Sequence, residues 1–247
     1  MFKSSVLISL VAAGCVASLC CPTVAQAQVV YSNDFETNTN GFNTASTSLL
    51  PTDSQGFGVS PESTYLGRFA NGTASLSLTG LEIGTTYTVE MDLFIGATWD
   101  GSQDVFQLGV QGGSFLVNSS FGNFGAQSYS DATPATGPGS AFAALTGADF
   151  FNLSPGNNTN RYAIYSFSKG AGNPTLQFTS IATTAQLDFT GVGLQDVTDE
   201  YWAVDNVVVS GPGVVSVPEA GAGALASIGT SMLAVGAFIT RRRRPVA

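Results

Sequence analysis

The stretch Tyr87-Thr88-Val89-Glu90-Met91-Asp92-Leu93-Phe94-Ile95 decides the fold class of this chain. Successive side chains of a strand point to opposite faces of a sheet. One face of this stretch is therefore wholly apolar, with Val89, Met91, Leu93 and Ile95, while the other carries Glu90, Asp92 and Phe94. Such alternation predicts a β-strand with one buried face.

Similar short runs, rich in Val, Thr, Phe and Tyr, recur between clusters of Gly, Asn, Asp, Ser and Pro. They predict further strands at residues 28–33, 65–70, 74–81, 105–111, 113–119, 161–169, 175–180 and 202–210. No stretch before the C-terminal part keeps a helical period, and residues 127–139, with Pro134 and Pro138, indicate a surface loop. The number and spacing of the strands favour an all-β sandwich of two antiparallel sheets.

Composition limits the partners of this domain, which we place at residues 28–210. Residues 28–218 hold 16 acidic residues, which are all of the 17 in the chain except Glu219. They hold three basic residues, so their formal charge is about −13. Nucleic acid is excluded as a partner on this ground, because phosphate contacts need a basic surface. All three cysteines lie at or before residue 21, so no disulfide is expected in the domain.

The N-terminal residues predict export. Lys3 precedes an apolar run at residues 6–16, and Ala25-Gln26-Ala27 places small residues where signal peptidase cleaves, so residues 1–27 are interpreted as a signal peptide. An alternative is a lipoprotein box at Ala12-Ala13-Gly14-Cys15 with Cys15 lipidated. Both interpretations place the domain outside the cytoplasm.

The C-terminal residues predict a membrane anchor. After a spacer at residues 211–217, the 21 residues 220–240 carry no charge and are long enough to span a bilayer at about 1.5 Å per residue. Arg241, Arg242, Arg243 and Arg244 follow, and basic residues remain on the cytoplasmic side. A core helix followed by a nucleic-acid-binding tail is the alternative interpretation.

Residues 218–247 resemble the PEP-CTERM sorting tail, which consists of a Pro-Glu-Pro motif, a membrane helix and an Arg-rich end. Val217, Pro218, Glu219 and the four arginines carry the resemblance, whereas Ala220 stands in place of the second proline. The resemblance implies an exosortase-type transpeptidase and the membrane as partners, and a final location at the cell surface or in an extracellular matrix rich in polysaccharide.

The domain itself resembles extracellular jelly-roll modules of the lectin or carbohydrate-binding type. The residues that carry this are Asn33-Asp34-Phe35-Glu36, Tyr65-Leu66-Gly67-Arg68-Phe69, Trp99-Asp100-Gly101, Asp104-Val105-Phe106 and residues 199–207. The resemblance implies a jelly-roll sandwich that binds glycan without catalysis.

Catalysis is restricted by the lack of histidine, which leaves only carboxylate chemistry for a hydrolase. Glu90 and Asp92 share one strand face and partly resemble the acidic strand motif of sandwich-fold glucanases, but Phe94 occupies the position of the third acid. We prefer the simpler interpretation that both acids face solvent, and we predict no catalytic residue.

Acidic residues near the strand ends suggest a structural calcium site, because Ca²⁺ prefers oxygen ligands. The residues concerned are Glu36, Asp100, Asp104, Glu200 and Asp205. In jelly-roll modules a calcium ion links the first and last strands, a role the resemblance maps onto Glu36 and Asp205. The alternative is that these are ordinary turn residues.

The two tryptophans are possible glycan platforms, since an indole can stack on a sugar while neighbouring polar groups bind its hydroxyls. We expect Trp99, next to Asp100, to be exposed in a loop, and Trp202 to belong to the core rather than to a platform. The predicted function is a noncatalytic, exported surface or matrix module that binds glycan. Two alternatives stay open, a secreted carboxylate-dependent glycan hydrolase or lyase, and a structural adhesin without ligand.

Overall fold

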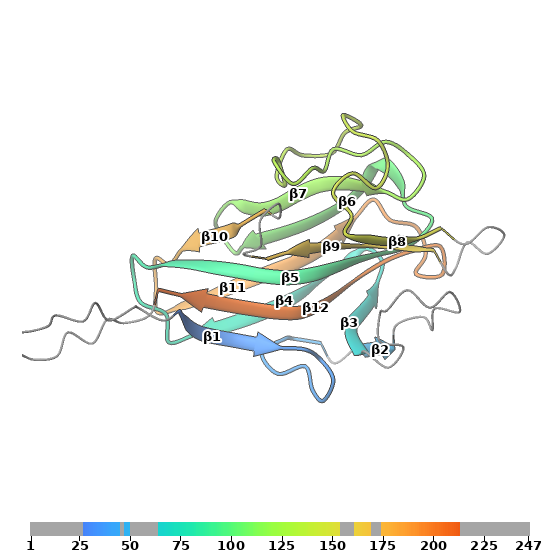
Figure 1. Cartoon of the computed structure of the whole chain (residues 1–247). Coiled ribbons are helices and arrows are strands. Elements are labelled where there is room, and N and C mark those ends of the chain that lie inside the picture. The colour runs from blue at the N-terminus through green and yellow to red at the C-terminus, as the bar shows by residue number, and fades with distance from the viewer. Residues whose placement is uncertain (1–26, 45–46, 50–63, 154–160, 169–173, 213–247) are drawn as a thin grey trace, which may run out of the picture. The chain divides into compact units, whose positions relative to one another are not determined.

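The computed structural model describes residues 27–44, 47–49, 64–153, 161–168 and 174–212, and residues Gln26–Val214 form one compact unit. Every regular element in these ranges is a β-strand, and the strands form two antiparallel sheets (Figure 1). The predicted all-β fold with two antiparallel sheets is confirmed. Within the same ranges, no helix has the length and hydrophobicity needed to cross a bilayer. The sorting motif, the apolar segment 220–240 and all but the last residue of the predicted signal peptide lie outside the described residues.

The larger sheet is built around two long central strands. Its path is β2-β3-β12-β5-β9-β8, while β1 also pairs with β12 and β10 also pairs with β5. The bounds are β1 (Gln28–Asn33), β2 (Thr47–Leu49), β3 (Thr64–Phe69), β5 (Thr86–Ala97), β8 (Phe150–Asn152), β9 (Tyr162–Phe167), β10 (Leu176–Thr179) and β12 (Glu200–Gly211). β1 and β3 share one side of β12, and β9 and β10 share the far side of β5.

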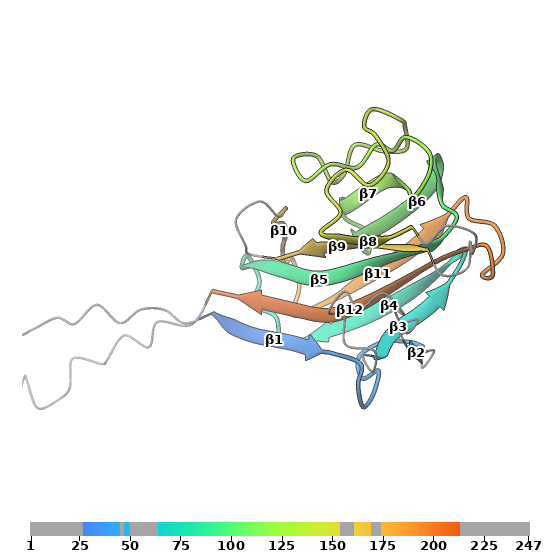
Figure 2. The ribbon, with the colours of Figure 1, turned by 45° about the vertical axis from the view of Figure 1, so that its right-hand side comes forward.

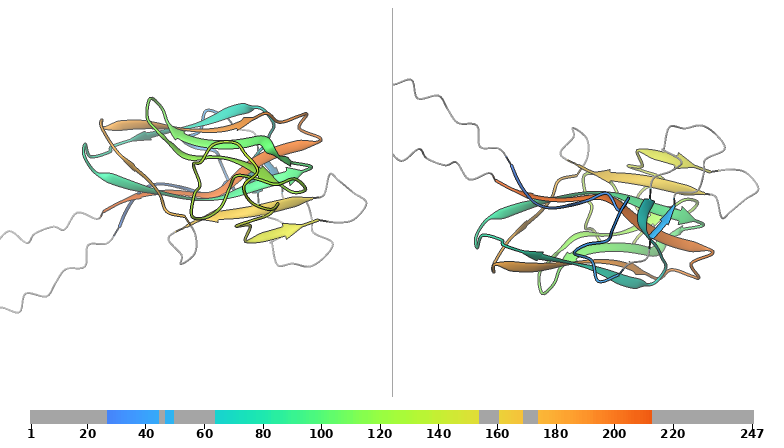
Figure 3. Two further views of the ribbon diagram at one scale, coloured as in Figure 1. Left: turned by 90° about the horizontal axis from the view of Figure 1, so that it is seen from above. Right: turned by 90° about the horizontal axis from the view of Figure 1, so that it is seen from below.

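The smaller sheet has the order β4-β11-β6-β7 and packs against the larger one, as the two layers in Figure 3 show. Its strands are β4 (Gly72–Thr79), β6 (Asp100–Val110), β7 (Phe115–Gly122) and β11 (Thr184–Val192). The chain passes from one sheet to the other at β3–β4, β4–β5, β5–β6, β7–β8, β10–β11 and β11–β12. Segments far apart in sequence therefore meet at both ends of the sandwich.

The alternation that decided the fold class is present in the structure. Val89, Met91, Leu93 and Ile95 are buried in the main core between the sheets. Phe94, on the opposite face, belongs to a second apolar cluster with Tyr65, Tyr162, Ile164 and Ala203. The outer face of the larger sheet is thus partly apolar, which the sequence pattern alone did not indicate.

All nine predicted strands are found, with their ends shifted by a few residues. Three observed strands, β2, β8 and β11, were missed. β11 is the largest omission, because it lies in the middle of the smaller sheet between β4 and β6. Its Leu187 and Phe189 alternate with Gln186 and Asp188, but the neighbouring Thr and Ala residues obscure the pattern.

The segment predicted as a surface loop, residues 127–139, has no strand but is not entirely at the surface. It lies beside β6 and β7 (Figure 2), and Gln127, Ser128, Tyr129 and Ser130 are buried. The ring of Tyr129 stacks on Phe121 with centroids 4.6 Å apart. The prediction was wrong for these four residues, because an aromatic side chain in a loop can bury the backbone that carries it.

Candidate functional site

Polar side chains gather at both ends of the sandwich, and the two ends differ in chemistry. We call the region of residues 97–104 and 193–200 the closed end, because loops from both sheets pack together there. We call the region of residues 77–79, 110–114 and 177–186 the open end, because a cleft separates the sheets there. The two are at opposite ends of β5 and β6.

The closed end is formed where β5 turns into β6 and where β11 continues into β12. Ala97 adopts a left-handed backbone conformation with φ 66°, which redirects the chain into Trp99. The Thr98 amide donates to the carbonyl of Asp199 at 2.9 Å. Gly193 approaches the other loop so closely that a Cβ there would lie 2.3 Å from the carbonyl oxygen of Gln103. These contacts hold the two connections against each other.

Two carboxyl groups meet inside this end. The Asp104 carboxylate accepts hydrogen bonds from the backbone amides of Asp100 and Gly101 and contacts the carboxyl group of Glu200. Glu200 Oε2 accepts from the Gln195 amide at 2.7 Å, whereas Oε1 is buried without a donor among the described residues. Two carboxyl oxygens in contact need a proton or a cation between them, because both are otherwise acceptors.

Burial and charge shift both groups toward the protonated form. The side chain of Glu200 is 0% exposed. Its pKa is raised to about 7, first by burial and then by the negative charges of Asp104, Asp100 and Asp199, against the stabilising amide of Gln195. Burial also raises the pKa of Asp104, opposed by its two backbone amide donors. The pair is therefore suited to hold one proton near neutral pH.

The five residues predicted to bind calcium do not form one group. Asp104 and Glu200 contact each other, and Asp100 is bonded to Asp104 through its backbone amide. Asp205 is five residues further along the extended strand β12, about 16 Å from Glu200 at 3.3 Å per residue. Glu36 accepts the amide of Thr64 with its Oε1 at 2.8 Å. A single ion with Ca–O distances of about 2.5 Å cannot reach all five. In the ranges the structure describes, no three or more Asp, Glu, His or Cys side chains are arranged to hold a metal.

The prediction that Trp99 is exposed was wrong. Its side chain is 0% exposed, and its indole nitrogen donates to the carbonyl of Tyr201 at 3.1 Å. A buried indole cannot stack on a sugar. The polar residues after Trp99 suggested a loop, but the left-handed turn at Ala97 directs the ring into the core.

Trp202 is a core residue, as preferred from the sequence. It packs against Phe69 and Phe106, with ring centroids 4.7 Å and 5.3 Å away, and its indole nitrogen donates to the carbonyl of Ala70 at 2.9 Å. Neither tryptophan can therefore act as a glycan platform. Asp100, the third predicted glycan-binding residue, is exposed at the closed end.

Glu90 and Asp92 lie on the outer face of β5, opposite the core residues Val89 and Met91. The Asp92 carboxylate is held by two neutral donors, Ser166 Oγ at 2.6 Å and Asn206 Nδ2 at 2.8 Å. Both donors lie on neighbouring strands of the larger sheet. These bonds give Asp92 a role in joining the strands on that face.

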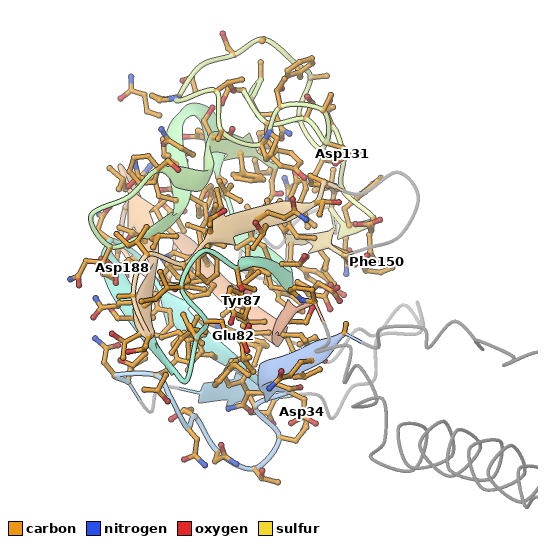
Figure 4. All side chains as sticks on the ribbon, turned by 90° about the vertical axis from the view of Figure 1, so that its left-hand side faces the viewer. Asp34, Glu82, Tyr87, Asp131, Phe150 and Asp188 are labelled. Atoms are coloured by element: carbon orange, nitrogen blue, oxygen red, sulfur yellow. The ribbon has the colours of Figure 1, made fainter. Side chains whose placement is uncertain are left out.

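The open end contains a cleft of about 640 Å³. It lies between β10 on one side and β4, β11 and the turn from β6 to β7 on the other. Its lining includes four residues whose side chains face the interior: Leu78, Val110, Phe178 and Ala185. Hydrogen bonds fix the turns beside the cleft. The backbone amide of Gly84 donates to the backbone carbonyl of Ser180, and the backbone amide of Glu82 donates to the hydroxyl of Tyr87 at 2.9 Å (Figure 4).

The chemistry of the cleft is neutral. Its described lining contains hydroxyl and amide residues but no Asp, Glu, Lys or Arg; the polar members are Ser77, Thr79, Gln111, Ser114, Gln177, Thr179, Ser180, Thr184 and Gln186. Ile181, which is 90% exposed, adds an apolar contact at the rim. A cleft of this volume with an apolar lining and a polar rim has the general character of a small-molecule site.

This cleft was not predicted from the sequence. Ser, Thr and Gln on strand surfaces are too common to mark a site, and the cleft depends on how β10 is placed against β4, β6 and β11. Comparison with known protein families, curated proteins and solved structures gives no match. The assignment of a function therefore depends on the chemistry of the molecule.

Proposed function

We propose that this chain is an exported, noncatalytic surface or matrix protein whose domain binds a neutral glycan in the cleft at the open end. The observation that supports this most is the lining of the cleft, which combines apolar contacts with many uncharged donors and acceptors. Sugars present the matching surfaces, C–H faces and neutral hydroxyl groups.

Charge favours a neutral glycan over an acidic one. Among the described residues the basic side chains are Arg68 and Arg161, and each lies over an aromatic ring, Arg68 4.6 Å from the centroid of Tyr201 and Arg161 4.2 Å from that of Phe124. Neither lines the cleft. An anionic polysaccharide would meet a domain with a large excess of carboxylates and a cleft whose described lining holds no Lys or Arg.

The proposal includes the delivery of the protein. The leader at residues 1–27 exports it, and the PEP-CTERM-like tail at residues 218–247 is handled by an exosortase-type enzyme at the membrane. The pairing of β1 with β12, the first and last strands, supports a jelly-roll arrangement of the two sheets. A leader and a sorting tail of this kind bring the domain to extracellular polysaccharide.

A catalytic function is the second candidate, and the two carboxylate pairs differ in how well they support it. Asp104 and Glu200 are buried, so a glycan could not reach them without opening the closed end. Glu90 and Asp92 are more accessible, but Asp92 is already bonded to Ser166 and Asn206. The geometry therefore favours binding, and a structural adhesin without ligand is the third candidate.

We also propose calcium as a ligand of the closed end, restricted to Asp104 and Glu200 with Asp100 nearby. The buried Oε1 of Glu200 supports this, because a cation would supply the missing partner. Calcium would then replace the proton between the two carboxyl groups. Its role would be structural, joining β6 to the start of β12.

The cleft is tested with the full-length chain in a detergent without sugar groups. A glycan array of neutral and acidic oligosaccharides should show binding of neutral members, which Ala182→Trp abolishes by filling the cleft. Ala132→Trp, on the loop that follows β7, is the matched control and should bind as the wild type does. Equal binding by both variants would reject the cleft as the site, and release of reducing ends from the glycans would favour the hydrolase.

A further inference from the structure

Phe115 is an exposed aromatic residue next to the cleft. It is the first residue of β7, pairs with Gly109 of β6, and is 49% exposed. Its ring lies against β6, since a Cβ on Gly109 would be 3.1 Å from Phe115 Cδ1. The next two residues, Leu116 and Val117, enter the core. The ring of Phe115 thus lies outside the core, over a glycine that leaves room for it.

Polar side chains surround this ring on the outer face of the smaller sheet. The register places Phe115, Gly109, Asp188 and Ser75 in one row across the four strands. Figure 4 shows Asp188 at the edge of the molecule, away from the buried Tyr87. Hydrogen bonds link the side chains of this face to one another: Ser75 to Asp188 and Gln186 to Asp188, both 2.7 Å, Gln107 to Asn118, 3.1 Å, and Thr73 with Thr190, 2.9 Å. The bonds fix these groups before any ligand binds.

The ring and the cleft are continuous. Ser114 lines the cleft and directly precedes Phe115, and Gln186 lines the cleft and donates to Asp188. A ligand in the cleft that extends past Ser114 therefore reaches the ring. Neighbouring strands are about 4.8 Å apart, so Asp188, two strands from Phe115, lies within reach of the same ligand.

We propose that Phe115 is a stacking platform that extends the cleft onto the outer face of the smaller sheet, so that the ligand is a neutral oligosaccharide chain and not a single sugar. This inference rests on the proposed function and adds the ligand's length and its second contact. An aromatic ring accepts the C–H face of a sugar, while Gln107, Asn118 and Asp188 offer groups for its hydroxyls. The described part of this face carries no Lys or Arg, which fits a neutral chain.

The test compares two exposed phenylalanines on different sheets. Phe115→Ala is matched by Phe151→Ala on β8, where the native ring is 51% exposed. Neutral oligosaccharides of increasing length, taken from the array, are titrated into the full-length chain by calorimetry. We expect Phe115→Ala to weaken binding of the longer oligosaccharides about three- to tenfold and to leave the shortest unchanged. Phe115→Tyr should restore binding, and Phe151→Ala should have no effect.

The outcomes separate this inference from the proposed function. Binding that is lost in Ala182→Trp but unchanged in Phe115→Ala at every length would overturn the platform and leave the cleft standing. Absence of binding by the wild type to any neutral oligosaccharide would overturn both. Concentration-dependent sedimentation of the wild type that disappears in Phe115→Ala, without a change in glycan binding, would identify a second copy of the chain as the occupant and overturn the platform.

Discussion

The closed and open ends of the sandwich are built from the same long strands, yet they place polar groups in opposite ways. At the closed end Asp104 and Glu200 are buried in contact with each other, while at the open end uncharged hydroxyls and amides surround a cleft. Burying a charge costs more than burying a neutral polar group. The closed end therefore needs a proton or a cation to be stable, whereas the open end needs neither and remains available to a ligand.

The difference comes from the connections. At the closed end, hydrogen bonds join the loops to each other. The indole nitrogen of Trp99 donates to the backbone carbonyl of Tyr201 at 3.1 Å, and the backbone amide of Asn123 donates to the backbone carbonyl of Trp99 at 2.8 Å. At the open end, the turn after β10 is hydrogen-bonded to the turn between β4 and β5. The backbone amides of Leu81 and Gly84 donate to the backbone carbonyls of Thr183 and Ser180, respectively. Those bonds stay within the rim and leave the cleft between the sheets.

The largest effect is expected from Trp99→Ala, which removes the side chain around which the closed end is packed. Loss of a fully buried Trp costs about 3–5 kcal/mol, and here the carbonyl of Tyr201 also loses its donor. At about 2–4 °C per kcal/mol for a domain of this size, the melting temperature should fall by about 10 °C. Thermal unfolding followed by circular dichroism measures the change.

The control for this comparison is Phe115→Ala at the open end. Its ring is about half exposed and lies outside the core, so the free energy of unfolding should change by about 0.5 kcal/mol or less. Similar losses from the two variants would mean that the ends do not differ in how much they contribute to stability. A Trp99→Ala protein that melts like the wild type would contradict the packing described above.

The next effect is a dependence of stability on pH that comes from the closed end. The pKa of Glu200 is raised to about 7 in the folded protein, first by burial, so the folded state binds more protons than the unfolded state. The contribution of Glu200 to the free energy of unfolding is fully present below the ordinary pKa of Glu, near 4.5, and is lost as the pH rises through about 7. The melting temperature should be several degrees lower at about pH 8 than at about pH 5.

Glu200→Gln isolates this contribution from the general repulsion among the acids. Glutamine keeps the shape of the side chain and can donate to Asp104 at any pH. The variant should therefore melt like the wild type at low pH and above it at high pH. If its melting temperature falls with pH as steeply as that of the wild type, the Asp104–Glu200 pair does not hold the proton.

The strands could be predicted because their signal is local. Val89, Met91, Leu93 and Ile95 repeat with a period of two, and this pattern depends on no other part of the chain. For Trp99, by contrast, the neighbouring residues gave a wrong prediction of exposure. The polar residues after it are typical of a loop, but the direction of its ring is decided by the backbone at Ala97 and by the carbonyl of Tyr201, 102 residues away.

The candidate sites were predictable in chemistry but not in grouping. Acidic residues near strand ends were recognised, yet only the folded arrangement brings Glu200 of β12 to Asp104 of β6, while Asp205 lies further along β12. The cleft and Phe115 gave no local signal. In the sequence, Phe115 looks like any other aromatic residue of a strand. Its exposure depends on the strand register, which places Gly109 beneath the ring.

The smallest of the effects expected at the closed end comes from calcium. A ligand that binds only the folded state stabilises it by RT ln(1 + [L]/Kd), and with a Kd of about 1 mM, about 10 mM calcium adds about 1.4 kcal/mol. The gain should appear at about pH 8 and vanish at about pH 5, because protons and calcium compete for Asp104 and Glu200. It should also be absent in Glu200→Gln. A melting temperature that calcium leaves unchanged at high pH would mean that the pair holds a proton alone, and an equal gain in Glu200→Gln would place the ion at other carboxylates.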